Sequence, residues 1–260
     1  MAELPTKVLQ SIRCAAEIIR ECRRAAVLTG AGISTHSGIP DFRSPDSGLW
    51  ERYDPLEVAS LQSFRYNPSK FYTWMRPLAL GIAAAEPNPA HDGITKLEQT
   101  GYVKTVITQN IDRLHQRAGS TNVLEVHGSF NTLTCTSCFC KYTSDEYLNA
   151  YLTRGEIPHC TSCHHVLKPD IILFGEQLPA ATWLKALDAS KKCDLMIVAG
   201  SSLEVLPVAG LPMRAIENGA HLIIINKSIT YLDVRADVVF NEDVTEIIPR
   251  IVNEVLDERK

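Results

Sequence analysis

Seven short apolar runs recur along this chain of 260 residues, and the stretches between them are long enough for helices. Most of the runs are continuously apolar, which is typical of strands buried on both faces of a parallel sheet. Strands that alternate with helices predict an α/β fold class, in which ligands bind at the carboxyl ends of the strands. The runs are AAVLTG (25–30), VKTVITQN (103–110), NVLEVHG (122–128), DIILFGE (170–176), DLMIVAGSS (194–202), HLIIIN (221–226) and DVVFN (237–241).

Helical patterns fill several of the gaps between these runs. Apolar residues recur at helical spacing from Leu9 to Cys22, and similar patterns occupy 89–101 and 208–220. Two regions interrupt the alternation: 36–91 is rich in aromatic residues and proline without a strand pattern, and 131–167 contains a cluster of cysteines. We expect both regions to be insertions that pack as a smaller second lobe.

The cysteine cluster has the spacing of a metal site. Two CTSC sequences, at 135–138 and 160–163, each allow a tight knuckle that directs two thiolates at one tetrahedral ion. Closing the 21-residue loop between them costs about 2–3 kcal/mol, whereas structural zinc contributes on the order of 10–16 kcal/mol in small peptides. The predicted ligands of one structural Zn²⁺ are Cys135, Cys138, Cys160 and Cys163. Other candidate ligands in this region are Cys140, His159, His164 and His165.

Composition excludes several classes of partner. The formal net charge of -4 argues against nucleic acid as the main partner, because phosphate binding normally requires a basic face. The apolar runs are far shorter than the roughly 20 residues of a membrane span, and the N-terminus lacks the layout of a secretory signal. Clustered cysteines favour a metal in a reducing compartment. We expect a cytoplasmic protein that binds neither nucleic acids nor membranes.

A glycine-rich turn follows the first predicted strand. Gly30 and Gly32 would let the backbone approach a phosphate, and the start of a following helix would supply free N–H donors. An ordinary tight turn uses the same residues. The dehydrogenase fingerprint also has a third glycine and an acidic residue about 20 positions later. Ser34 takes the third position here, so hydride transfer is not the expected chemistry.

Polar residues also follow the other predicted strands. Their side chains suit ribose hydroxyls, carboxamides and phosphates, and the carboxyl ends of parallel strands meet at one edge of a sheet. Taken singly, a histidine there is equally explained as a hydrogen-bonded structural residue, and an aspartate as a helix cap. The residues are Gln109, Asn110, Asp112, His127, Ser201, Ser202 and Asn226.

The chain resembles the sirtuin family of NAD-dependent protein lysine deacylases over nearly its whole length. The matching motifs are GAGIS, SGIPDFRS, PNPAH, TQNIDRLHQRAG, EVHGS, both CxxC pairs, KPDIILFGE, GSSLEVLPVA and IIIN, in the expected order. The resemblance implies a Rossmann-like domain formed by 1–35, 92–130 and 168–260. It also implies a smaller lobe built from a helical insertion (36–91) and a zinc ribbon (131–167), with NAD in the cleft between the two.

The resemblance also implies the roles of individual residues. His127 corresponds to the catalytic histidine, and Asn110 and Asp112 line the nicotinamide and ribose pocket. The NAD-binding residues that it implies are Gly30, Ala31, Ser34, Asp41, Phe42, Arg43, Gln109, Asn110, Asp112, Gly200, Ser201, Ser202, Asn226 and Val244. The acyl-lysine-binding residues that it implies are Ile172, Phe174, Gly175, Glu176 and Val205.

The reaction implied by the resemblance consumes NAD. The substrate amide oxygen attacks the ribose C1′ as nicotinamide leaves, which gives an alkylimidate. A neutral imidazole, with an unperturbed pKa of about 6.5, then accepts a proton from a ribose hydroxyl. The activated hydroxyl attacks the imidate, and the products are free lysine, nicotinamide and 2′-O-acyl-ADP-ribose.

Three other functions are compatible with parts of the sequence. Mono-ADP-ribosyl transfer uses the same cleavage of NAD. A non-catalytic sensor of NAD or ADP-ribose would not require a base, so the joint presence of His127, Asn110 and Asp112 argues against it. A nucleic-acid-binding zinc module is disfavoured by the negative net charge.

The acyl preference is predicted from the helical insertion. Family members that prefer acidic acyl groups carry a Tyr-x-x-Arg pair there. In FYTWMRP, Arg76 follows Tyr72 by four residues, not three. A neutral acyl group, acetyl first, is therefore the expected substrate.

Overall fold

The computed structural model describes residues 5–41 and 48–257, and it divides into two compact units. Unit 1 comprises 1–37, 86–126 and 181–260, and unit 2 comprises 38–85 and 127–180. The domain boundaries expected from the sequence differ from the limits of these two units. The expected boundaries stay a prediction.

Unit 1 is built on a parallel sheet of six strands in the order β3-β2-β1-β7-β8-β9. Counted within this sheet alone, the order is 3-2-1-4-5-6, that of a Rossmann fold. Six of the seven apolar runs supply the strands, which confirms the predicted fold class. The strands are β1 Ala25–Thr29, β2 Val103–Thr108, β3 Val123–Glu125, β7 Leu195–Ala199, β8 His221–Ile225 and β9 Val238–Phe240.

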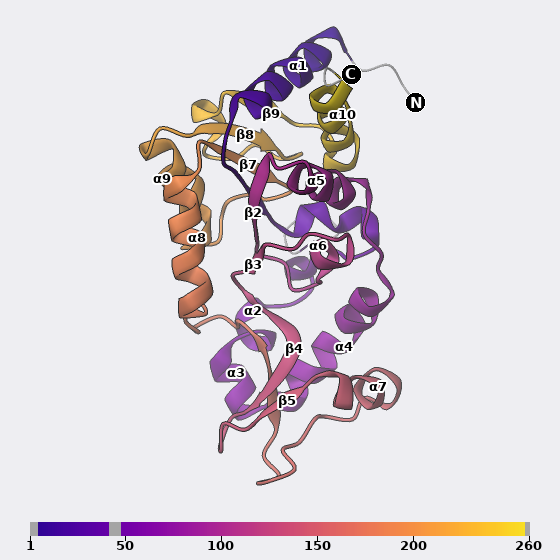
Figure 1. Cartoon of the computed structure of the whole chain (residues 1–260). Coiled ribbons are helices and arrows are strands. Elements are labelled where there is room, and N and C mark those ends of the chain that lie inside the picture. Colours follow the sequence, from indigo (N-terminus) through magenta and orange to yellow (C-terminus); the bar gives the residue numbers. More distant parts are fainter. Residues whose placement is uncertain (1–4, 42–47, 258–260) are drawn as a thin grey trace. The chain divides into compact units, whose positions relative to one another are not determined.

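Helices cover both faces of this sheet, as Figure 1 shows, with α1, α5 and α10 on one side and α8 and α9 on the other. Helices α1, α5 and α10 and the sheet enclose one aliphatic core, to which α1 contributes Ile12, Ala15, Ala16 and Ile19. The helices of unit 1 are α1 Thr6–Glu21, α5 Pro89–Gln99, α6 Leu114–Arg117, α8 Ala180–Lys192, α9 Leu211–Glu217 and α10 Val244–Asp257.

Local sequence explains where two of these helices start and stop. The Asn88 side chain accepts a hydrogen bond from the N–H of Ala90, and Pro89 occupies the first turn of α5. Gly219, with φ of 87°, lies just beyond α9, where a left-handed residue ends a helix without strain. No helix in the described parts of the chain has both the length and the apolar character needed to cross a membrane.

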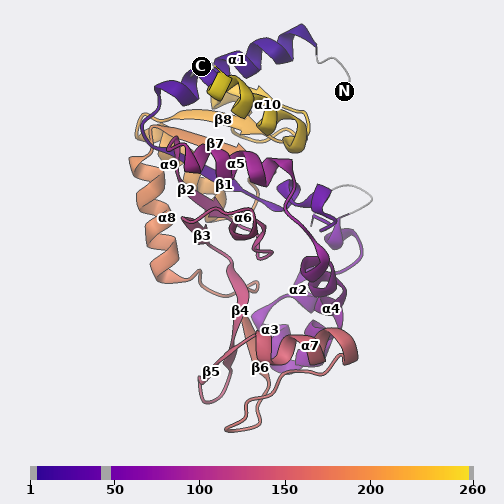
Figure 2. The same ribbon diagram turned by 45° about the vertical axis from the view of Figure 1, so that its right-hand side comes forward.

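Unit 2 combines helices with a small antiparallel sheet in the order β5-β4-β6 (Figure 2). Among the described residues of 38–85 the regular elements are helices, as the absence of a strand pattern predicts, apart from an isolated bridge between Ser60 and Phe174. The rings of Phe64, Phe71, Tyr72 and Tyr151 pack with centroids 5.2–6.1 Å apart. The elements are α2 Pro55–Val58, α3 Leu61–Tyr66, α4 Pro68–Ala84, β4 Gly128–Cys135, β5 Lys141–Thr143, α7 Asp145–Arg154 and β6 Leu167–Ile171.

The prediction that 170–176 is a strand of the parallel sheet is wrong. Strand β6 ends at Ile171 and pairs antiparallel with β4 in unit 2. An apolar run indicates burial but not the sheet that provides it. Here Ile171 and Leu173 are buried in unit 2, and the residues from 172 onward leave the strand.

Candidate active site and metal centre

The glycine-rich turn lies where the strand order of the parallel sheet reverses, between β1 and β7. The N–H of Gly32 donates to the carbonyl oxygen of Gly200 at 2.9 Å, so the loops after the two strands touch through their backbones. A Cβ on Gly200, whose φ is +62°, would lie 2.3 Å from the nitrogen of Ile33. Glycine is therefore required for this close approach, at the point where Rossmann folds bind nucleotides.

The turn is not followed by a long helix, contrary to the expectation of a helix N-terminus. Two 3₁₀ turns follow, η1 Ala31–Ile33 and η2 Thr35–Ser37. The hydroxyl of Thr35 donates to the carbonyl oxygen of Gly32 at 3.1 Å, and Gly38 has a φ of 86°. A side chain that bonds to nearby backbone competes with regular helix, which accounts for the early end.

Ser34, in place of a third glycine, holds together a buried polar cluster. Its hydroxyl donates to Asp112 Oδ2 at 2.7 Å and accepts from Asn110 Nδ2 at 3.2 Å. Asn110 Nδ2 also lies 3.0 Å from the carbonyl oxygen of Gly30, and Asp112 Oδ1 accepts from the N–H of Leu114 at 2.9 Å. These contacts confirm that residues from the first two predicted strand ends meet at one edge of the sheet.

Asp112 is the charged member of this cluster. Its burial raises the pKa of the carboxyl above its usual value, while the hydrogen bonds from Leu114 and Ser34 lower it. A buried carboxylate with partners on both oxygens has a fixed orientation. It can accept a hydrogen bond from a hydroxyl of a bound ligand, such as ribose.

The remaining expected NAD-binding residues of unit 1 extend this edge. Gln109 Nε2 donates to Ser201 Oγ at 2.9 Å, which links the ends of β2 and β7. Asn226 follows β8, and its amide donates to the carbonyl oxygen of Ser228 at 2.8 Å. Ala31 begins η1, Ser202 follows Ser201, and Val244 is the buried first residue of α10.

Two histidines that the sequence did not single out lie buried behind this cluster. The rings of His91 and His115 pack edge to face with centroids 4.9 Å apart. His115 Nε2 lies 2.9 Å from Thr29 Oγ1, which donates to Thr108 Oγ1, and Thr108 accepts in turn from the N–H of Asn110. The histidine pair is thus connected by hydrogen bonds to the backbone of Asn110.

Both imidazoles of this pair are neutral near pH 7. Burial lowers the pKa of His91 to about 4, and burial together with His91 lowers the pKa of His115 to about 3. Within the described chain, His91 Nε2 and His115 Nδ1 have no hydrogen-bond partner. Neither α5 nor the short α6, which carry them, gives a sequence signal for such a pair.

Most of the other expected site residues lie in unit 2. The carbonyl oxygen of His127 accepts from the N–H of Ile172 at 2.8 Å. Asp41 accepts from the N–H of Leu49 through its carbonyl oxygen, at 3.1 Å. Phe42 and Arg43 lie outside the described residues. Phe174, Gly175 and Glu176 follow Ile172 in the turn after β6, whereas Val205 belongs to unit 1.

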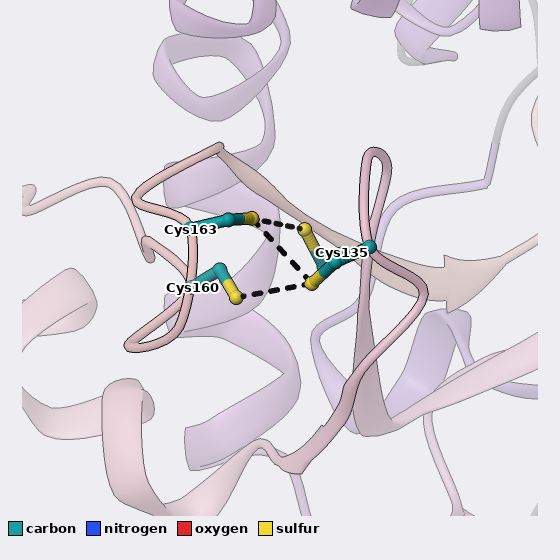
Figure 3. Close-up of side chains that lie close together, drawn as sticks. Cys135, Cys160 and Cys163 are labelled. Carbon is teal, nitrogen blue, oxygen red and sulfur yellow. Dashed lines mark hydrogen bonds between the residues drawn. The ribbon is translucent and has the colours of Figure 1, made fainter.

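The four predicted metal ligands come together in unit 2. Their Sγ atoms all lie within 4.8 Å of one another, and Figure 3 shows Cys163, on a separate loop, directed at Cys135. A Zn–S bond of about 2.3 Å places the thiolates of a tetrahedral site about 3.8 Å apart, and three of the contacts here measure 3.4–3.5 Å. The donor set and its spacing therefore fit one Zn²⁺ with a closed, structural shell.

The alternative ligands are not part of this group. Among the described residues, the only cluster with metal-binding geometry contains Cys135, Cys138, Cys160 and Cys163. His159 and His165 instead direct Nδ1 at the carbonyl oxygens of Ile157 and Cys163, at 2.7 and 3.2 Å. Tyr142 supports the cluster, because its hydroxyl lies 3.0 Å from Cys160 Sγ.

Comparisons with known proteins agree with this geometry. The model of the Sir2 family matches residues 30–207. The NAD-dependent protein deacylase 2 of Archaeoglobus fulgidus is 48% identical over 245 residues, which cover 94% of this chain and 96% of that protein.

Solved structures agree as well. A solved Sir2 enzyme is 47% identical with a TM-score of 0.92, over 96% of this chain and 99% of that one. A Sir2 structure with a deacetylated p53 peptide and 3′-O-acetyl ADP-ribose is 39% identical with a TM-score of 0.87, over 95% and 98% of the two chains. The chain belongs to the Sir2 family.

Proposed function

We propose that this protein removes acyl groups, acetyl first, from protein lysines in an NAD-dependent reaction. The observation that carries the proposal is the buried cluster of Ser34, Asn110 and Asp112 beside the glycine turn of a Rossmann sheet, in a chain of the Sir2 family. Acyl-lysine, NAD and water are consumed, and free lysine, nicotinamide and 2′-O-acyl-ADP-ribose are formed. Proteins or peptides that carry acyl-lysine are the proposed partners, and the cytoplasm is the proposed location.

Each residue has a defined task in this proposal. His127 accepts a proton from a ribose hydroxyl as a neutral imidazole. Asn110 and Asp112 orient the nicotinamide and its ribose, because their side chains are held by Ser34 and the backbone. The Zn²⁺ held by the four cysteines supplies structure to unit 2 and no reacting group, since a four-thiolate shell has no open position.

Contacts in unit 2 favour a neutral acyl group. Arg76 donates from Nη2 to the carbonyl oxygens of Leu152 and Thr153, at 3.0 and 2.9 Å, near the end of α7. The Tyr72 hydroxyl donates to the carbonyl oxygen of Leu167 at 2.6 Å. Both side chains therefore stabilise the fold of the unit, because the Tyr72 hydroxyl and the Nε and Nη2 of Arg76 are engaged with its backbone.

Mass spectrometry of an acetyl-lysine peptide, with and without NAD, tests the proposal. We expect NAD-dependent loss of the acetyl group together with acetyl-ADP-ribose, abolished in His127→Ala. The matched control is His221→Ala, at the amino end of β8, which should retain wild-type turnover.

Other outcomes would replace the proposal. ADP-ribose attached to protein without deacylation would favour a mono-ADP-ribosyltransferase. NAD binding without turnover of acetyl, succinyl or longer acyl peptides would favour a sensor. Succinyl turnover faster than acetyl turnover would overturn the neutral acyl preference alone.

A further inference from the structure

Lys168 is a buried lysine in β6 whose ammonium group is fully engaged within unit 2. It is 8% exposed, and its Nζ donates to the carbonyl oxygens of Pro169 at 3.0 Å and Ile171 at 2.8 Å. The same atom lies 2.9 Å from Glu176 Oε2. An ammonium has three N–H donors, so these three acceptors satisfy it. A charge buried in this way is held in one place, because moving it would leave its donors without partners.

Glu176 links this ammonium to the segment 172–176. Its Oε2 also accepts from the N–H of Leu173 at 2.8 Å, and its own N–H donates to the carbonyl oxygen of Leu173 at 3.0 Å. Gly175 completes the turn between these two residues with a φ of 87°. One carboxylate oxygen thus joins the start of β6 to the turn that follows it.

The backbone of the same segment is held on two other sides. The N–H of Ile172 donates to the carbonyl oxygen of His127 at 2.8 Å. The N–H of Phe174 donates to Ala59 at 2.9 Å, and its carbonyl oxygen accepts from Leu61 at 3.0 Å. The shape of 172–176 therefore follows from these backbone contacts together with the Lys168–Glu176 pair.

We propose that Lys168 and Glu176 are positioning residues, which together hold 172–176 in the shape that receives the acyl-lysine substrate. Glu176 then acts through Lys168 and Leu173, and not by direct contact with the substrate as the family resemblance implies. This inference rests on the proposed function and deepens it, because it concerns the substrate side of the same site.

The two residues act as one unit in this proposal, which makes it testable by a double-mutant cycle. Removing either partner leaves the other charge buried and unpaired, so the segment loses its shape in both cases. Lys168→Met and Glu176→Gln should each raise the Kd and KM of an acetyl-lysine peptide by about tenfold or more. The double variant should be no worse than the single ones, because they remove the same interaction.

The KM for NAD serves as the internal reference. The cluster of Ser34, Asn110 and Asp112 lies in unit 1, so the KM for NAD should stay within about twofold of wild type. Glu57→Gln is the matched control, because Glu57 pairs with Lys70 at 2.7 Å on the exposed surface of the same unit. Peptide Kd values are measured by fluorescence anisotropy, with zinc content and melting temperature recorded for each variant.

Two outcomes of the double-mutant cycle would overturn the inference. In the first, Lys168→Met keeps the wild-type peptide Kd while Glu176→Gln loses it, which would mean that Glu176 touches the substrate directly. In the second, the fold-increases in peptide Kd of the two single variants multiply in the double variant. If Lys168→Met fails to fold, Lys168→Arg retains the charge but cannot meet the same three acceptors. Wild-type peptide affinity in a folded Lys168→Arg would also refute positioning.

The outcome for the proposed function is read separately. A wild type that deacylates the peptide, with variants that all keep its Kd, refutes only the positioning of 172–176. A wild type without NAD-dependent turnover refutes the proposed function itself.

Discussion

The sheet of unit 1 and the ribbon of unit 2 are stabilised by different interactions. In unit 1, every residue of β1 is buried, and the aliphatic side chains of three helices pack with the sheet in one core. Around β4 and β6, the buried apolar cluster consists of Leu133, Cys135, Cys160 and Leu167. Two of these four residues are predicted metal ligands. We therefore expect hydrophobic burial to stabilise the first region and Zn²⁺ binding to stabilise the second.

The rest of unit 2 shows how such a ribbon is attached to its own neighbours. Tyr151 on α7 packs edge to face against Tyr72 on α4, with centroids 5.2 Å apart, and donates to its carbonyl oxygen at 2.6 Å. Tyr72 in turn donates to Leu167 in β6. Aromatic rings with satisfied hydroxyls thus connect the helices to the ribbon, where aliphatic packing is scarce.

Removal of zinc should have the largest effect and should separate the two regions. Cys160→Ser, or a chelator, removes on the order of 10 kcal/mol of binding free energy, which is comparable to the whole stability of a domain. We expect β4, β5, β6 and α7 to lose amide protection while β1, β7 and β8 keep theirs, as measured by hydrogen exchange.

Cys140→Ser is the control for this experiment, because Cys140 is exposed and lies outside the ligand cluster. It should retain one zinc per chain. Equal loss of amide protection in the parallel sheet would show that the two regions do not differ in their dependence on zinc.

A cavity in unit 1 should produce the next largest effect, and it should leave the metal bound. Ile223 in β8 is completely buried in the aliphatic core, so Ile223→Ala should lower the free energy of unfolding by about 2–5 kcal/mol. Urea denaturation with a parallel zinc assay measures both quantities. Val234→Ala, at a position that is 88% exposed, should change stability by less than about 0.5 kcal/mol. Loss of zinc in Ile223→Ala would contradict the independence of the unit 1 core from metal binding in unit 2.

Lowering the pH should destabilise unit 1, because two neutral histidines are buried in it. The pKa of His91 falls from 6.5 to about 4 on folding, and that of His115 to about 3. Below pH 6.5 the unfolded chain therefore binds protons that the folded chain does not. Stability is complete above pH 6.5 and falls as the pH decreases toward the folded values, by up to about 1.4 kcal/mol per pH unit for each histidine.

The measurement is the free energy of unfolding between pH 7 and 4, followed by hydrogen exchange of β1 and β2. His115→Gln removes one titrating group and should reduce the slope by up to about 1.4 kcal/mol per pH unit. Zinc content at each pH separates this effect from protonation of the thiolates in unit 2. If the free energy of unfolding of His115→Gln depends on pH as steeply as that of the wild type, His115 does not contribute to the pH dependence.

Much of this molecule was predictable from local patterns. The apolar runs at 25–30, 103–110 and 194–202 became adjacent strands, because a continuous apolar run between helices has few other ways to bury its side chains. The pairing of the two CTSC sequences followed from knuckle geometry alone. The run at 170–176 shows the limit of such patterns, because Ile171 and Leu173 are buried, but the strand that ends at Ile171 pairs in a different sheet.

The sequence by itself determined the Rossmann sheet, the four-cysteine cluster and the polar residues at the strand ends, because each depends on periodicity or spacing within a short segment. Only the tertiary structure decided that Ser34 bonds to Asp112, that His91 packs on His115, and that Lys168 is buried beside Glu176. Those pairs depend on which elements pack together, and burial of a polar group is set by its surroundings and not by its neighbours in sequence.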